Sequence, residues 1–392
     1  MTEIIHHLNL EESIQALHKL STYAFTPTPP LPELEPFAKV IRQQKGAEYF
    51  AVYADGGLQS IGGLRDLSQN LRGKIFRMGG IANVASHPAG RRKGYVRTLL
   101  RHIFKVCRDK GFIVSCLYPF KEVFYERLGY VTLPQAMKIF FNPEVLAPVL
   151  NMNHEGSVEL VKFEQGYAEY LAYLEEIQQT THGLSRFVLP NHEMAKERDT
   201  WLAFARSKDR LVGLMQYTLK GEMMQQELYA HDFLYSNPQG KFLLLDWIAR
   251  HINQVLKAVL VLQPNIKGET LFTDLRPKSE GLFPPPMGRV IDIENLRGLK
   301  VGDGEISIQV TDPDCEWNNG VWMLAGKNGH LAIEKGRTPD CDLTIQGLSA
   351  LVYGVYDPDE FNLRGWGNPD TESSSVLRGM FPAAMPFLHA MY

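Results

Sequence analysis

The stretch VASHPAGRRKGYV, Val84–Val96, joins a predicted strand to a predicted amphipathic helix and decides the fold of the N-terminal region. A strand that feeds a helix through such a turn aims backbone N–H groups at one point, because the donors of the first helical turn are unsatisfied. The helix dipole adds partial positive charge there, and Arg91, Arg92 and Lys93 add full charges. Gly94 lets main chain approach a ligand without an intervening Cβ. The stretch predicts a diphosphate site, with a solvated basic turn as an equally weighted alternative.

The residues around this stretch predict a mixed α/β region over 1–148. Two apolar runs flank Asp55-Gly56-Gly57 and indicate a β-hairpin, and IFRMGGIANVAS forms the next strand. Apolar residues at helical spacing from Tyr95 to Cys107 predict a helix with its cations on the other face, and FIVSCLYPF predicts a buried strand. One helix precedes a Pro-rich loop, Thr26–Pro36, and a second follows it around 37–44.

The middle region, 149–285, repeats part of this order. AHDFLYSNPQGKFLLLDWIARH, residues 230–251, parallels IANVASHPAGRRKGYVRTLLRH, residues 81–102, with a shorter turn that lacks the arginines. We interpret it as an internal repeat that has kept the fold and lost the loop chemistry.

The C-terminal region, 286–392, follows a predicted linker at Pro284–Pro286. Four segments there alternate apolar and polar residues and predict an antiparallel sheet, and SALVYGVYD predicts a helix. The last residues, MFPAAMPFLHAMY, are apolar and aromatic, so we expect them to be docked on the protein.

Composition excludes several function classes. The 392 residues carry a formal charge of −3, which argues against coating nucleic acid or an anionic membrane. The four cysteines form no C-x-x-C pair, and the histidines show no zinc-site spacing, so we expect no metal. The first residues lack a signal-peptide pattern, and no apolar run reaches a membrane span, so we expect a cytoplasmic protein with reduced thiols.

The stretch resembles the signature of the GNAT family of acetyl-CoA-dependent N-acetyltransferases, Q/R-x-x-G-x-G/A. Arg91, Gly94 and Val96 stand at its three fixed positions, and Val96 departs from the small final residue. The whole chain resembles the Eis-like (enhanced intracellular survival) group more closely. Three features carry this: R-R-K-G before two bulky residues, the segment FYERLGY at Phe124–Tyr130, and the aromatic tail ending in Tyr392.

This resemblance implies the fold class: tandem GNAT folds with mixed central sheets, a GNAT domain at 1–148 and a degenerate one at 149–285, and a sterol-carrier-like α+β domain at 286–392. It implies acetyl-CoA as co-substrate, direct transfer to primary amines through a tetrahedral intermediate, and a homo-oligomer, typically a hexamer. It implies coenzyme contacts at Val84, Ala85, Ser86, Arg91, Arg92, Lys93, Gly94, Tyr95 and Val96.

The resemblance also assigns chemistry to two tyrosines, Tyr125 as general acid and Tyr392 as the residue whose α-carboxylate is the general base. A tyrosine has a pKa of ~10 and a thiol ~8.5, so full proton transfer to the leaving thiolate is uphill by roughly 2 kcal/mol. We therefore expect Tyr125 to stabilise the thiolate by a hydrogen bond, unless its pKa is lowered. From the residues alone, a core tyrosine and a packed tail anchor are the favoured readings.

The acceptor is a small-molecule amine in this reading, such as an aminoglycoside, a polyamine or a lysine. Tyr23, Phe25, Glu33 and Glu35 flank or occupy the Pro-rich loop, and an acidic, aromatic lip would suit a polycation; a solvated loop is at least as well supported. Two rivals stay open: a lipid or sterol carrier with a vestigial acetyltransferase half, and an aminoacyl transferase of the tandem-GNAT kind. The intact R-R-K-G turn speaks against the first, and the near-neutral charge against the second.

Overall fold

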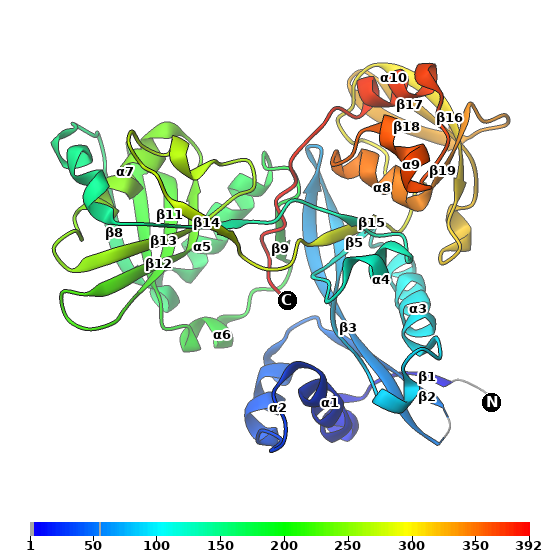
Figure 1. The fold of residues 1–392 in the computed structure, drawn as a ribbon, viewed down its shortest axis with the longest axis horizontal. Coiled ribbons are helices and arrows are strands. Elements are labelled where there is room, and N and C mark those ends of the chain that lie inside the picture. Colours follow the sequence, from blue (N-terminus) through cyan, green and yellow to red (C-terminus); the bar gives the residue numbers. More distant parts are fainter. Residues whose placement is uncertain (1–3, 55) are drawn as a thin grey trace. The chain divides into compact units, whose positions relative to one another are not determined.

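The computed structural model describes residues 4–54 and 56–392, which form two compact units (Figure 1). Of the described residues, the first unit contains 4–54, 56–134, 181–189 and 285–392, and the second contains 135–180 and 190–284. These units group residues that contact one another and do not define fold domains. The domain boundaries predicted at residues 148 and 285 therefore stay predictions. Asp55 of the predicted hairpin turn lies outside the described residues.

The first unit is built on a mixed sheet in the order β1-β2-β3-β4-β5-β15-β6, with β9 paired to β3. Its strands are β1 (Ile4–His7), β2 (Glu48–Ala54), β3 (Gly57–Leu71), β4 (Lys74–Ser86), β5 (Val114–Leu117), β6 (Val131–Thr132), β9 (Ser185–Phe187) and β15 (Met287–Val290). Its helices before the second unit are α1 (Leu10–Phe25), α2 (Leu34–Gln43), α3 (Tyr95–Asp109) and α4 (Glu122–Glu126). The order of elements over the first 117 residues confirms the mixed α/β expectation, with α2 beginning three residues before the expected position.

Strand periodicity divides the core of this sheet between two helical layers. Successive side chains of a strand point to opposite faces, and in β2 the side chains of Phe50 and Val52 pack with α3. Those of Tyr49 and Ala51 pack instead with α1 and α2. The sheet is therefore covered on both faces.

The C-terminal part of the first unit has its own sheet, in the order β18-β17-β16-β19. Its elements are β16 (Gly304–Thr311), β17 (Gly320–Lys327), β18 (His330–Lys335), β19 (Cys341–Thr344), α8 (Ile345–Tyr353), α9 (Phe361–Arg364) and α10 (Thr371–Met380). The expectation of a wholly antiparallel sheet is wrong for one pair, because β16 and β19 run parallel. The alternation of apolar residues sets a strand's faces but says nothing about its direction.

The second unit has a sheet in the order β14-β7-β13-β12-β11-β10-β8, in which β12 and β13 are parallel. Its elements are β7 (Met137–Phe141), β8 (Ser157–Lys162), α5 (Phe163–Gln178), α6 (His192–Glu197), β10 (Trp201–Ser207), β11 (Arg210–Lys220), β12 (Gln226–Tyr235), α7 (Pro238–Ala249), β13 (Val255–Leu262) and β14 (Lys278–Gly281). A parallel β12–β13 pair with α7 between the strands matches the β4–α3–β5 arrangement of the first unit. The internal repeat is therefore a repeat of fold.

Candidate active site

The free edge of β4 creates the first part of the site. β5 pairs with β4 only from Met78 to Ile81, where Ile81 faces Leu117, but β4 continues to Ser86. A left-handed residue, Asn83 (φ 51°), lies in this extension. An unpaired strand edge presents backbone donors and acceptors, and it can receive an extended ligand as an added strand.

The turn that follows β4 aims main-chain donors at the same place. His87 caps a short 3₁₀ turn by accepting a hydrogen bond from the Ala89 amide (3.3 Å). α3 then starts after Gly94, whose φ of 91° is strained for any other residue and which provides no side-chain cap. The first hydrogen bond of the helix runs from the Thr98 amide to the Gly94 carbonyl (3.0 Å). The amides of Val96 and Arg97 precede it and have no carbonyl of their own helix to bind.

The second copy of this turn is closed by its own residues. Asn237 caps α7 by accepting a hydrogen bond from the Gly240 amide (3.0 Å), and Pro238 removes one N–H group from the first turn. A Cβ on Gly240 would lie 2.0 Å from the Val212 carbonyl oxygen, so strand and helix touch there. The second copy therefore keeps the fold, but the start of α7 offers fewer free amide donors than the start of α3.

A cleft of about 670 Å³ opens over the β4 edge and the α3 N-terminus. The predicted coenzyme residues that line it are Val84, Ala85, Ser86, Arg91, Arg92, Gly94, Tyr95 and Val96. Lys93 is exposed and is not part of the lining. The cleft therefore brings together all but one of the predicted coenzyme positions.

Five further lining residues were not predicted as site residues: Ala24, Gly90, Arg97, Phe120 and Phe124. Phe120 is the last residue of the apolar run that contains β5, and its place shortly after that strand was its only signal. Arg97 forms an ion pair with Asp314 (2.9 Å), which a charge pattern on one helix does not reveal.

Of the four residues expected to border the acceptor, two line the cleft and two lie outside its lining. Tyr23 and Phe25 line the cleft and are 51% and 59% exposed. Glu33 and Glu35 are exposed and lie outside the cleft lining, and Glu35 contacts Arg42 (3.3 Å). The expected acidic lip is thus absent from the cleft lining among the described residues.

Tyr125 lies on α4, in an aromatic cluster next to the cleft. Its ring contacts those of Phe120, Phe124 and Tyr130 at centroid distances of 5.7, 5.0 and 6.1 Å. The side chain is buried, and no described residue forms a hydrogen bond with its hydroxyl. Burial raises the pKa of Tyr125, so the phenol is neutral at physiological pH.

Tyr392 lies against the sheet at β4. A Cβ on Gly80 would come within 2.8 Å of its ring, and the Tyr118 ring lies 5.9 Å away. Its phenol oxygen is buried without a hydrogen-bond partner, and burial raises the pKa of Tyr392. The tail before it is fixed by the Tyr118 hydroxyl, which donates to the Ala390 carbonyl (3.3 Å), and by Ser185 Oγ, which accepts from the Ala390 amide (3.0 Å). This confirms a docked tail.

The cysteines do not offer a nucleophile at this site. All four cysteines are buried, and burial raises the pKa of the Cys116 thiol to about 12, so a thiolate nucleophile is disfavoured. Among residues 4–54 and 56–392, no three His, Cys, Asp or Glu side chains gather as metal ligands. None of the helices described is long and apolar enough to cross a membrane.

Comparison with known proteins identifies two segments of the chain. Residues 5–133 match the acetyltransferase (GNAT) domain family, and residues 293–389 match the sterol carrier protein domain family. A search of curated proteins found no match.

Solved structures match over the whole chain. They include a GCN5-related N-acetyltransferase from Anabaena variabilis (17% identity, TM-score 0.85, all of both chains) and another from Kribbella flavida (19%, 0.83, all of this chain and 99% of that one). Eis1 from Mycobacterium abscessus matches with 17% identity and a TM-score of 0.78 over all of both chains. At these identities the likeness shows the fold. Residues 5–133 are therefore a GNAT acetyltransferase domain and residues 293–389 a sterol carrier protein domain, within an Eis-like tandem GNAT fold.

Proposed function

We propose that the protein is an acetyl-CoA-dependent N-acetyltransferase that acts on primary amines. The observation that carries the proposal is the meeting of α3 amide donors, the free edge of β4 and an aromatic cleft in one place. Aminoglycosides, polyamines and lysine side chains are the acceptors suggested by the resemblance.

The donor set fits the coenzyme. Amides at the start of α3, with Arg91 and Arg92 beside them, suit a diphosphate, and none of the described lining residues is acidic. The pantetheine arm is an extended amide chain, so it can bind the edge of β4 beyond Ile81. The coenzyme would supply the thioester as acyl donor.

Tyr125 is proposed to donate a hydrogen bond to the leaving sulfur. Because burial raises its pKa further, full proton transfer to a thiolate of pKa ~8.5 is even less favourable than for a free tyrosine. A neutral phenol with an unused O–H group can still stabilise the developing charge. The buried, protonated cysteines favour direct attack by the amine over an acyl-enzyme.

The α-carboxylate of Tyr392, the last residue of this sequence, is proposed as the base that receives the proton of the attacking amine. The ring packs at Gly80, on the strand whose continuation carries Val84 and Ser86. A carboxylate of ordinary pKa is a weak base, so a water relay or a desolvated amine would be required.

The test is thiol release from acetyl-CoA with a panel of amines, on wild type and on Tyr125→Phe. We expect Tyr125→Phe to lower kcat by about tenfold to a thousandfold with little change in coenzyme binding, in line with the loss of one preorganised donor. Tyr229→Phe on β12 of the second unit is the matched control and should behave as wild type. Unchanged kcat for Tyr125→Phe would refute its role.

A second test addresses Tyr392. Extending the chain by one glycine converts the α-carboxylate into an amide and should suppress turnover. Normal turnover in the extended protein would exclude this group as the base.

The sterol carrier domain match at 293–389 keeps lipid binding as a second candidate. Calorimetry with acetyl-CoA and, separately, with a fatty acid distinguishes the two: heat from the fatty acid alone would favour the carrier. Hexamer formation stays a prediction and is measured by light scattering.

A further inference from the structure

We propose that the preferred acceptor is a single primary amine on an aromatic or other apolar body, and not a polycation. This inference rests on the proposed N-acetyltransferase function and specifies its substrate class. It starts from three aromatic side chains that line the cleft yet stay open to solvent, Tyr23 (51% exposed), Phe25 (59%) and Phe120 (71%).

Single exposed apolar side chains are ordinary, but three aromatic rings that line one cleft form a patch, and such a patch marks a binding surface. Phe120 stacks obliquely on Phe124, also in the lining, at a centroid distance of 5.4 Å. A flat or apolar acceptor that covers these rings removes apolar surface from water on both partners.

The charges of the cleft point the same way. Its described lining residues include no carboxylate, and Glu33 and Glu35 lie outside it. A single amine becomes neutral when it loses the proton that attack requires, so it brings no charge into the cleft. A polyamine keeps its other ammonium groups, and each would lose water without gaining an anionic partner.

The experiment compares kcat/KM for 2-phenylethylamine and tryptamine with that for spermidine and kanamycin at one ionic strength, by thiol release. We expect the apolar amines to be favoured by about tenfold or more. A preference for spermidine or kanamycin would overturn the acceptor class while leaving the transferase function intact. No thiol release with any amine, under conditions where acetyl-CoA binds, would refute the proposed function itself.

Variants of the aromatic wall sharpen the test. Phe120→Ala should raise KM for 2-phenylethylamine by about fivefold or more, with KM for acetyl-CoA within about twofold of wild type. Phe283→Ala is the matched control, because Phe283 is 47% exposed but does not line the cleft. Equal KM values in all three proteins would overturn the role of the rings.

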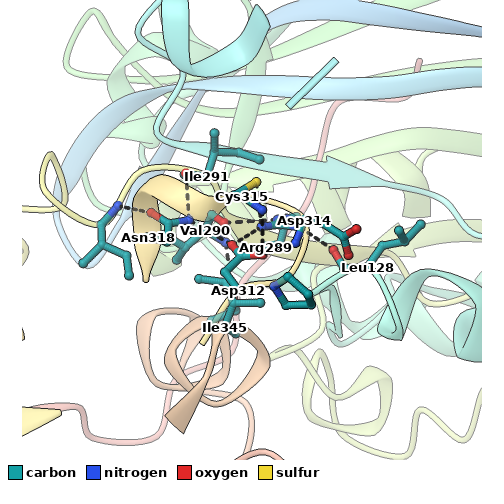
Figure 2. A network of polar contacts seen from close by, with 12 residues as sticks. Leu128, Arg289, Val290, Ile291, Asp312, Asp314, Cys315, Asn318 and Ile345 are labelled. Carbon is teal, nitrogen blue, oxygen red and sulfur yellow. Dashed lines mark hydrogen bonds and ion pairs between the residues drawn. The ribbon is translucent and has the colours of Figure 1, made fainter. Parts of the chain in front are cut away.

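A second inference has an independent basis in a buried ion pair, shown in Figure 2. Arg289 lies on β15 and Asp312 lies just after β16, both fully buried, with 2.6 Å between Nη2 and Oδ2. Asp312 is held in turn by the amide of Cys315 (3.1 Å) and the side chain of Asn318 (2.9 Å). The guanidinium also lies 4.4 Å from the Phe104 ring centroid on α3. Its position is thus fixed from several sides.

The remaining arm of Arg289 reaches the turn behind Tyr125. Its Nη1 donates to the Leu128 carbonyl, and the Leu128 amide donates to the Tyr125 carbonyl (2.9 Å). From this chain of contacts we infer that Arg289 is a positioning residue for Tyr125, through which β15 and the region after it orient α4. The inference depends on the role proposed for Tyr125.

A double-mutant cycle tests it. We expect Arg289→Lys to lower kcat by about tenfold, with KM for acetyl-CoA within about twofold, and to have less than a twofold effect on kcat when Tyr125 is already phenylalanine. A purely structural role would lower kcat equally in both backgrounds and would overturn the inference. A wild-type kcat for Arg289→Lys would do the same.

Folding is followed separately by thermal unfolding. If Arg289→Lys fails to fold, Asp312→Asn, which keeps the side-chain volume, goes through the same cycle with the same expectations. Arg378→Lys is the matched control, since Arg378 forms an exposed ion pair with Asp357 (2.7 Å) in the same C-terminal region. It should leave kcat unchanged.

Discussion

Replacing Gly80 by alanine should disturb the proposed site, because the added Cβ would press on the ring of Tyr392. The new Cβ would lie 2.7 Å from Leu67 Cδ1 and 2.8 Å from Tyr392 Cε2. Carbon atoms prefer separations of about 3.5–4.0 Å, so at least one neighbour must move. Leu67 is fully buried and Tyr392 only partly, so the shift should fall mainly on Tyr392.

The magnitude follows from two opposed effects. Overpacking a tight site costs about 1–3 kcal/mol. Replacing glycine by alanine recovers about 0.4–1 kcal/mol through the unfolded state, where the backbone fits. We expect unfolding free energy to fall by about 1–2 kcal/mol. A displacement of ~1 Å in a reacting group can cost about a hundredfold in rate, so kcat should fall by about tenfold to a hundredfold.

Gly79→Ala is the matched control, because it adds the same atom to the other face of the same strand. Its Cβ would lie 2.9 Å from Cys107 Sγ and 3.0 Å from Leu64 Cδ1, in the core under α3. The two variants should lose similar stability in urea unfolding. Only Gly80→Ala should lose kcat, with KM for acetyl-CoA unchanged. Equal kcat values in the two variants would refute the link between Tyr392 and catalysis.

Three further predictions concern the coenzyme site, the tail and pH. The double variant Arg91→Ala/Arg92→Ala should weaken acetyl-CoA binding by about tenfold to a thousandfold by calorimetry, and a salt-independent affinity of the wild type would contradict a diphosphate contact. Ser185→Ala leaves the buried Ala390 amide without its acceptor, so urea unfolding should show a loss of about 1–3 kcal/mol; an unchanged midpoint would mean that the tail is held elsewhere. Burial lowers the pKa of His182 to about 4, below its unfolded value of ~6.5, so its stabilising contribution is complete above pH ~6.5 and is lost as pH falls towards 4. His182→Asn should reduce the loss of unfolding free energy over this pH range. An identical loss in both proteins would exclude His182 as its source.

The gathering of most predicted coenzyme positions in one cleft was predictable because their signals are local. A strand, a basic turn and an amphipathic helix follow one another between residues 75 and 109, so neighbouring positions in the sequence are neighbours in the cleft. The internal repeat was visible for the same reason.

Features that depend on distant contacts were not predictable. Phe120 lines the cleft and packs on Phe124 of α4, and Glu33 and Glu35 lie outside the cleft lining; a loop's composition does not give the direction of its side chains. The parallel pairing of β16 with β19 and the insertion of β15 into the first sheet are likewise set by the whole fold. The propensity of a segment indicates its secondary structure. Its direction and its neighbours in a sheet depend on the segments with which it packs.

The place of β15 has a consequence for how the molecule is made. This strand joins β5 to β6, yet it is synthesised more than 150 residues after both. A ribosome therefore releases the whole of the second unit before the first sheet can close. We expect β5 and β6 of the nascent chain to keep unpaired edges until β15 has been made. Chaperones would be needed to protect such edges. The sheet of the GNAT domain would thus be among the last parts to reach its final form.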